Sequence, residues 1–182
     1  MPRQESALRH DVSTVRQALI AAGLPFLSVE EEGKLGTVIR VTADQRDELV
    51  EFLRDNELAY TQLLDIFGAD IEAREAVEAD EEKGTAATPA TAGYIEVTYF
   101  MRSMSADSDL RIKMQLPYES DYHSIIELFA SAYLTERELC EMFGLVLLDH
   151  PNPKKLVTNQ HFHTPLLKKV PIRGKEELWK RG

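Results

Sequence analysis

Six residues in the C-terminal half of the chain combine acidic, basic and aromatic side chains at short spacing. They are Glu136, Arg137, Glu138, Glu141, Phe143 and Gly144. Paired carboxylates can act as general acid and base, so one interpretation of this run is a catalytic cluster. The same spacing fits a short capped helix in which Thr135 is the N-cap, Glu138 closes a capping box and Gly144 ends the helix. Capping and the helix dipole would then account for glutamates in the first turns.

Thiol and imidazole side chains in the same region raise the question of a metal site. They are Cys140, His150, His161 and His163. His161 and His163 would lie on one face of an extended segment, because side chains alternate along such a backbone. The sequence has no pair of CxxC motifs, however, and a single cysteine cannot hold an iron–sulfur cluster. We therefore expect neither metal nor cofactor in this chain. The alternative is a small stand-alone acidic enzyme or metal-binding protein that uses the His150/His161/His163 cluster.

Length and composition indicate one globular domain with an extension. The chain has 182 residues, of which 43% are apolar and 29% charged, which is ordinary for a soluble protein and excludes a fibrous or wholly disordered chain. No apolar run approaches the roughly 20 residues that a membrane span needs. The first residues show no apolar segment of a secretory signal, and the single cysteine favours a reducing compartment. We therefore expect a cytoplasmic protein.

Charge divides the chain into an acidic body and a basic end. Residues 150–182 hold eight Lys and Arg against two Glu, a balance of +6, so residues 1–149 carry −16 of the total of −10. An acidic body repels nucleic acid, and we expect no nucleic-acid partner. A basic end on such a body fits a segment that lies on an acidic protein surface, or a solvated end without a partner.

The elements that must position these side chains alternate between helices and hairpins. Helices are predicted over residues 11–22, from Thr42 with Gln45 in a capping-box position, from Ser120–Asp121, and from Thr135. Strands are predicted over residues 25–29, 37–41, 60–67, 94–101 and 110–116. This order predicts an α+β fold, with a mixed or antiparallel sheet and helices packed on one side.

Two segments depart from this pattern. Residues 70–92 begin acidic and continue as a small, polar, aperiodic run, and we interpret them as a mobile acidic loop inside a single domain of residues 1–149. From His150 the regular patterning stops, and prolines at positions 151, 153, 165 and 171 exclude a helix or central strand. Residues 150–182 are thus predicted to be an extended, basic, Pro-rich C-terminal arm.

Taken together, the motifs resemble a known family. The run Glu136-Arg137-Glu138, Glu141, Phe143-Gly144 is followed by His150-Pro151, Lys154-Lys155 and Pro165-Leu166 with a basic pair at Lys168. This series is similar to the thirty-kilodalton subunit of respiratory complex I. The same module occurs in membrane-bound NiFe hydrogenases and formate hydrogenlyases. Glu141 stands where complex I sequences usually have Asp, and Asp149 where they have Gly. The resemblance does not separate a quinone reductase from a hydrogenase.

The resemblance implies a non-catalytic scaffold subunit in the peripheral arm of a membrane-associated, ion-translocating redox complex. It implies no cofactor in this chain, a hydrogenase-large-subunit-like partner, and neighbouring subunits that carry iron–sulfur clusters and either NiFe or flavin. The chain would lie on the inner face of the cell membrane without spanning it. The residues expected to bind the partner are Glu136, Arg137, Glu138, Glu141, Phe143, Gly144, His150, Pro151, Lys154, Lys155, Phe162, Pro165, Leu166 and Lys168.

Overall fold

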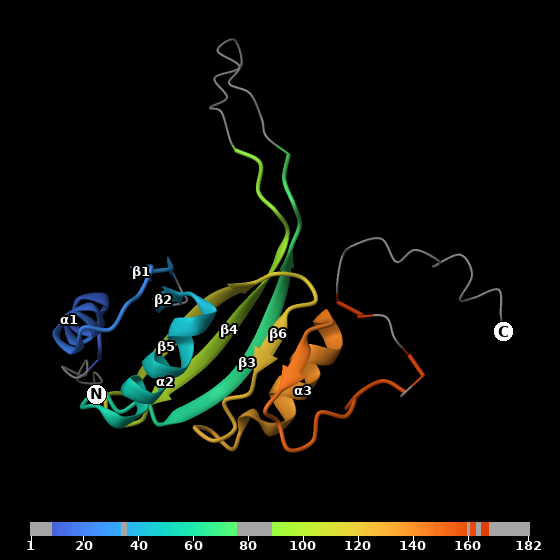
Figure 1. Cartoon of the computed structure of the whole chain (residues 1–182). Coiled ribbons are helices and arrows are strands. Elements are labelled where there is room, and N and C mark those ends of the chain that lie inside the picture. The colour runs from blue at the N-terminus through green and yellow to red at the C-terminus, as the bar shows by residue number, and fades with distance from the viewer. Residues whose placement is uncertain (1–8, 34–35, 76–88, 160, 163–164, 168–182) are drawn as a thin grey trace, which may run out of the picture.

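A computed structural model of the chain describes residues 9–33, 36–75, 89–159, 161–162 and 165–167 (Figure 1). Helices and strands alternate in it, and a short 3-10 turn, η2 (Ala43–Gln45), precedes the second helix. In chain order the elements are α1 (Val12–Ala22), β1 (Ser28–Glu31), β2 (Thr37–Val41), α2 (Arg46–Asp55), β3 (Gln62–Ile71), β4 (Tyr94–Ser103), β5 (Ser108–Leu116), β6 (Asp121–His123), α3 (Ala132–Phe143) and β7 (Val146–Leu148).

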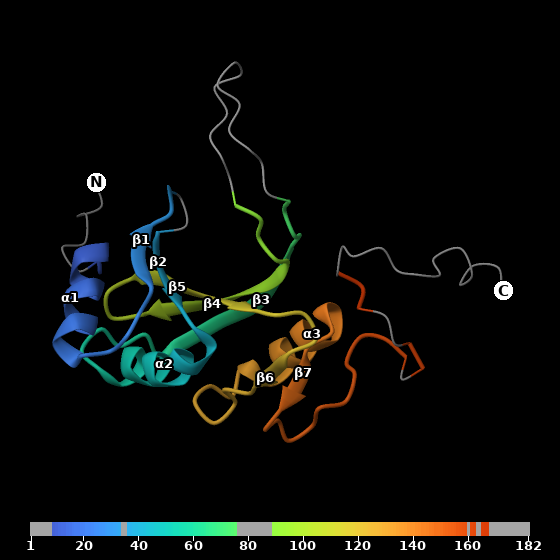
Figure 2. The ribbon, with the colours of Figure 1, turned by 45° about the horizontal axis from the view of Figure 1, so that its top comes forward.

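A five-stranded mixed sheet forms the centre of the fold, with the strand order β1-β2-β5-β4-β3. The β2–β5 pair is parallel and the other neighbours are antiparallel. Figures 1 and 2 show α2 and α3 on the same side of this sheet and α1 beside β1. The predicted α+β class is therefore confirmed. The predicted C-terminal arm lies partly outside the described residues, and those that are described after Leu148 form no helix or strand.

The core lies between the sheet and the helices. One row of facing residues crosses all five strands, and all of its members are buried: Val29, Ile39, Ile112, Tyr99 and Ile66. Apolar residues at helical spacing cover this face, because residues three and four apart share one side of a helix. They are Val15 and Leu19 of α1, Leu49, Val50 and Leu53 of α2, and Leu139, Met142 and Phe143 of α3.

The opposite face of the sheet carries a charged network. Arg40 contacts Glu32 at 2.5 Å and Glu96 at 3.2 Å, and Lys113 contacts the same two carboxylates at 2.9 and 3.3 Å. Each charge therefore meets two of opposite sign, and the network links Glu32, the residue after β1, with β2, β4 and β5 on the face of the sheet opposite the core.

The second half of the chain builds a small strand–helix–strand unit. β6 and β7 pair in parallel, and α3 connects them. The helix predicted from Ser120–Asp121 is wrong, because Tyr122 pairs with Leu147 in this ladder. The backbone N–H of Ile125 is bound by a side chain of α3. Of that predicted helix only a single turn remains, in which the N–H of Phe129 donates to the carbonyl of Ile125 at 2.9 Å.

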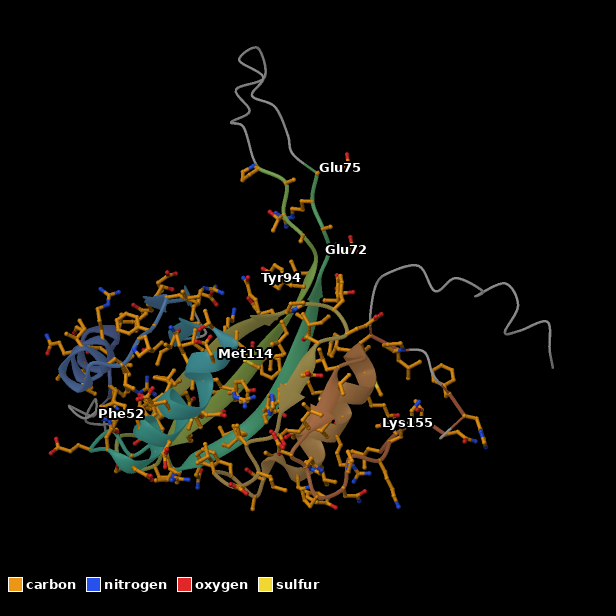
Figure 3. The ribbon with its side chains drawn as sticks, in the orientation of Figure 1. Phe52, Glu72, Glu75, Tyr94, Met114 and Lys155 are labelled. Carbon is orange, nitrogen blue, oxygen red and sulfur yellow. The ribbon has the colours of Figure 1, made fainter. Side chains whose placement is uncertain are left out.

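The β3–β4 hairpin continues beyond the sheet. Arg74 and Thr91 exchange two backbone hydrogen bonds of 2.9 Å, so the described ends of the predicted 70–92 loop form a two-stranded extension. Figure 3 shows Glu72 and Glu75 on this extension, away from the body of the fold. Residues 76–88 of the predicted loop lie outside the described residues. The longest described helix, α3, has 12 residues, and among the described residues no helix could cross a membrane.

Candidate docking site

The N-cap of the motif helix α3 lies four residues earlier than the sequence predicts. The helix starts after Ser131, so the prediction that Thr135 is its N-cap is wrong. The Thr135 hydroxyl instead donates to the carbonyl of Ala132 within the first turn, at 3.2 Å. The predicted stop is confirmed: Gly144 has φ 74°, and its N–H donates to the carbonyl of Cys140. A left-handed C-cap suits glycine because it has no Cβ.

Glu136 lies in the core and not on the surface. Its side chain is fully buried, and its carboxylate accepts hydrogen bonds from the Ile125 N–H at 2.7 Å, from the Ser124 hydroxyl and from the Tyr122 hydroxyl at 3.2 Å. Burial raises the pKa of Glu136, and these hydrogen bonds oppose that shift. The sequence predicts that Glu136 binds a partner subunit, but in the structure its carboxylate is bound by residues of this chain.

A chain of buried hydroxyls continues from Glu136 to a buried guanidinium on α2. Tyr99 donates to Tyr122 at 3.0 Å, and Arg46 donates to Tyr99 at 3.0 Å. The Arg46 guanidinium also lies over the Tyr122 ring, 5.3 Å from its centroid. Burial raises the pKa of Tyr99 to about 12, so this hydroxyl stays protonated and can donate. The network ties α2, β4, β6 and α3 together.

Arg137 and Glu141, one helical turn apart, hold the segment that follows β7 against α3. The Arg137 guanidinium donates to the carbonyls of Lys154 at 2.9 Å and Lys155 at 3.1 Å. The Glu141 carboxylate accepts the backbone N–H groups of residues 156–158 at 2.6, 3.0 and 2.6 Å, and also the hydroxyl of Thr158. We call this pair of side chains the clamp. It satisfies backbone groups that have no partner in a helix or sheet.

The protonation of Glu141 follows from the clamp. Partial burial acts to raise its pKa, but the hydrogen bonds from Thr158, Val157 and Leu156 outweigh it and lower the pKa to about 2. Glu141 is therefore a carboxylate at neutral pH, and its charge is taken up by backbone donors of the same chain.

His150 fixes the start of the segment. It is 7% exposed, its Nε2 lies 3.1 Å from the carbonyl of Tyr133, and its Nδ1 accepts the N–H of Asn152 at 3.0 Å. Because a carbonyl requires a donor, Nε2 carries the hydrogen and Nδ1 the lone pair that Asn152 uses. Both ring nitrogens are thus engaged, and His150 has no lone pair left for a metal ion. His163, the third histidine of the alternative hypothesis, lies outside the described residues.

The clamp encloses a cavity of about 360 Å³ between α3, β7 and the segment after it. We call it the motif cavity. Six predicted site residues line it, together with Cys140: Arg137, Glu141, Gly144, Lys154, Lys155 and Pro165. A Cβ on Gly144 would meet Pro165 Cγ at 2.6 Å, so only glycine allows this approach. Burial raises the pKa of the Cys140 thiol to about 12, which leaves it a weak nucleophile.

The other predicted site residues are spread around this cavity. Phe143 is buried and packs against Gly68, whereas Glu138, Pro151 and Leu166 are exposed. Phe162 is half-buried and donates its N–H to the carbonyl of Asn159. Lys168 lies outside the described residues.

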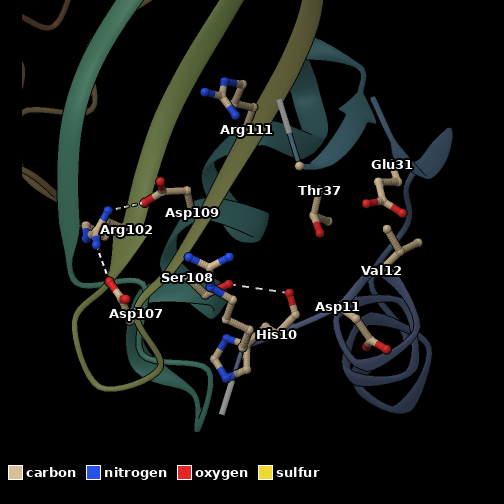
Figure 4. A pocket seen from close by; sticks show the side chains of 12 residues that line it. His10, Asp11, Val12, Glu31, Thr37, Arg102, Asp107, Ser108, Asp109 and Arg111 are labelled. Atoms are coloured by element: carbon tan, nitrogen blue, oxygen red, sulfur yellow. Dashed lines mark hydrogen bonds and ion pairs between the residues drawn. The ribbon is translucent and has the colours of Figure 1, made fainter. Parts of the chain in front are cut away.

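Figure 4 shows a second cavity, of about 450 Å³, at the far end of the sheet. Its Arg102 guanidinium is bound to both Asp107 and Asp109. The positive charge of Arg102 is therefore already compensated. None of the residues singled out from the sequence lies there, so we do not regard it as the functional site.

Sequence reasoning missed several residues of the site. Tyr133 binds His150 and Asn152, and Thr158 completes the clamp. Tyr122 and Arg46 belong to the buried network and are far apart in the sequence. The spacing of Arg137 and Glu141, four residues apart, was the one available signal that both side chains share a helix face.

Comparisons with known proteins show the family to which the chain belongs. A family model described as "Respiratory-chain NADH dehydrogenase, 30 Kd subunit" matches residues 39–176. The C-type subunit of the NADH-quinone oxidoreductase of a Wolbachia species from Brugia malayi is 32% identical over 151 residues, which cover 81% of this chain and 70% of that protein. Three further relatives are of the same subunit type, and the chain spans 62%, 60% and 54% of their respective lengths.

Two other matches differ in kind. A combined C/D-type subunit of the NADH-quinone oxidoreductase of Shewanella woodyi is 27% identical over 184 residues, which cover 96% of this chain and 29% of that protein. A chain in the structure of the membrane-bound sulfane sulfur reductase, an archaeal respiratory membrane complex, has a TM-score of 0.50 at 16% identity. The match covers 76% of this chain and 70% of that one, and it shows a shared fold. From the family match and the 32% identity it follows that the chain belongs to the family of the 30-kilodalton subunit of respiratory-chain NADH dehydrogenase.

Proposed function

We propose that this chain is a non-catalytic scaffold subunit of an NADH-quinone oxidoreductase-type complex and that it docks on a D-type partner subunit. The observation that carries the proposal is the Shewanella woodyi relative, whose name joins the C and D types in one protein. This chain aligns over 96% of its own length with only 29% of that relative. Two subunits that are joined in one chain are expected to be neighbours when they are separate, and the remaining length has room for the partner.

The chemistry of the candidate site supports a docking role over a catalytic one. Glu136 is bound to three donors in the core and Glu141 to backbone N–H groups, so neither carboxylate is positioned as a general acid or base. The exposed apolar side chains of the segment after β7 are available for contact instead. They are Leu156, Val157, Leu166 and Leu167, with exposed fractions of 37 to 60%. Full burial of such a side chain is worth about 1.5–3 kcal/mol, and docking would gain the share that corresponds to the part still exposed.

The remaining parts of the proposal concern the complex. We propose that redox cofactors reside in the partner subunits, as iron–sulfur clusters with either flavin or NiFe, and that this chain holds none. It would lie on the inner face of the cell membrane as a peripheral subunit of an ion-translocating assembly.

Affinity purification of the tagged chain from its own organism, under mild detergent, tests this proposal. We expect a D-type protein and iron–sulfur subunits in stoichiometric amounts, identified by mass spectrometry. Elemental analysis of the separately purified chain should show less than one equivalent of Zn, Ni or Fe. A chain that purifies alone, or one that carries a stoichiometric metal, would contradict the scaffold function.

A further inference from the structure

We propose that the motif cavity is a socket for an acidic side chain, Asp or Glu, of the D-type partner. This inference rests on the proposed function and adds to it the surface that is used and the chemistry that fits it. The cavity of about 360 Å³ has room for a carboxylate side chain. It lies between a helix, a strand and the clamped segment, so its walls are fixed before a partner arrives.

The clamp preforms these walls. Arg137 binds two carbonyls and Glu141 three consecutive N–H groups of the segment that closes the cavity. The segment has no regular secondary structure of its own, and without these bonds it would have to be ordered when the partner binds. A preformed site avoids that entropic cost. Arg137 and Glu141 are therefore positioning residues.

The charge of the lining selects an anion. Glu141 and Arg137 oppose each other in charge, and both are engaged by backbone groups, which leaves Lys154 and Lys155 as the uncompensated charges of the cavity wall. No ion pair joins either lysine to a carboxylate among the described residues. This local +2 stands on a chain whose net charge is −10, so an acidic group of a partner is attracted here and repelled elsewhere.

The chain's own C-terminal residues are a poor occupant for this socket. Residues 168–182 contain six Lys and Arg and two Glu, a balance of +4. The positive charge of Lys154 and Lys155 repels this basic segment, whereas it attracts an acidic side chain of the partner. The partner is therefore the favoured source of the carboxylate.

Binding of the full chain to the purified D-type partner of the same organism tests the socket. We expect Lys154→Glu to weaken the complex about tenfold or more, because it places a carboxylate beside the incoming one. Arg74→Glu is the matched control. It makes the same change in net charge on the hairpin extension, and we expect a loss of less than about threefold. Equal losses for the two variants, with assembly intact, would overturn the socket and leave the proposed function standing. No assembly of the wild-type chain would overturn both.

The two lysines provide an independent readout. Lys154 and Lys155 line the motif cavity, so their acetylation, followed by mass spectrometry of peptides from this chain, reports whether an acidic group occupies the cavity. We expect the acetylation of both lysines to slow when the partner binds. Unchanged acetylation of both in the complex would overturn the socket. Faster acetylation of the free chain on Glu176→Gln with Glu177→Gln would also overturn it, because the chain's own end would then be the occupant.

Discussion

Replacing Glu136 by alanine should destabilise the fold severely, although the side chain belongs to a motif that reads as a surface cluster. The change leaves the Ile125 N–H and the Tyr122 hydroxyl, both buried, without their acceptor, and also removes the partner of Ser124. A buried donor without an acceptor costs about 1–3 kcal/mol, and breaking a buried charged network costs about 3–5 kcal/mol. We therefore expect a loss of about 3–5 kcal/mol, or about 6–20 °C in melting temperature for a chain of this size.

Urea unfolding followed by circular dichroism measures this loss, and Glu138→Ala is the matched control. Glu138 lies two residues away on the same helix, is exposed, and should change stability by less than about 0.5 kcal/mol. Glu136→Gln should cost less than Glu136→Ala because it keeps an acceptor for Ile125. If Glu136→Ala and Glu138→Ala lose the same small amount, the buried network does not stabilise the fold.

The pH dependence of the same variants gives a second check. Because burial raises the pKa of Glu136 above its ordinary value of 4.5, the folded state binds a proton more readily than the unfolded state does. The corresponding stability is fully present below pH 4.5 and is lost as pH rises through the raised pKa. The advantage of the wild-type chain over Glu136→Gln should therefore shrink from acid to neutral pH. An advantage that grows with pH would contradict this assignment.

Three further predictions concern packing, the clamp and the hairpin. Gly68→Ala would bring a Cβ to 2.6 Å from Phe143 Cε2, and we expect a loss of about 1–3 kcal/mol by denaturant unfolding, partly relieved by adding Phe143→Leu. The clamp should loosen as pH falls from 4.5 to about 2, the range over which the lowered pKa of Glu141 acts. In NMR the Thr158 amide should titrate near pH 2 in the wild type and not in Glu141→Gln, and titration in both would refute this assignment. Replacing residues 76–90 by a short Gly-Ser link should leave the melting temperature nearly unchanged, and a fall of more than about 10 °C would contradict it.

Long periodic segments allowed much of the sheet to be predicted. β5 alternates apolar and polar residues from Leu110 to Leu116, and β4 carries buried apolar residues at every second position from Ile95 to Met101. This period of two is typical of a half-buried strand. β6 and β7 have three residues each, which is too short for any period to show. Without these two strands, the segment that begins at Ser120–Asp121 was predicted to be a helix, since Ile125 and Phe129 also have helical spacing.

The sequence identified most residues that line the motif cavity, but it did not predict which atoms they contact. The sequence pattern brought Arg137, Glu141, Lys154 and Lys155 into one group, and the structure gathers them at one cavity. The burial of Glu136 could not be inferred, because its partners Tyr122, Ser124 and Ile125 lie in a segment that the sequence predicts to be a helix. From the sequence, Glu136 could be explained by a place in the first turn of the helix, where a carboxylate is favourable. The structure excludes this explanation, because α3 starts at Ala132.

The parallel β2–β5 pair has a consequence for how the chain is made. Thr37 faces Leu110 and Val41 faces Met114 in this pair, so the first hairpin, β1–β2, can join the sheet only after the chain has been synthesised past β5. Until then β2 has one unpaired edge while the ribosome adds some seventy residues, which takes about 4–14 seconds at bacterial and eukaryotic rates. β3, β4 and β5 pair with their neighbours in sequence and can form without waiting. The N-terminal hairpin is thus the part of the sheet that is exposed longest during translation, and the part where a chaperone has time to bind.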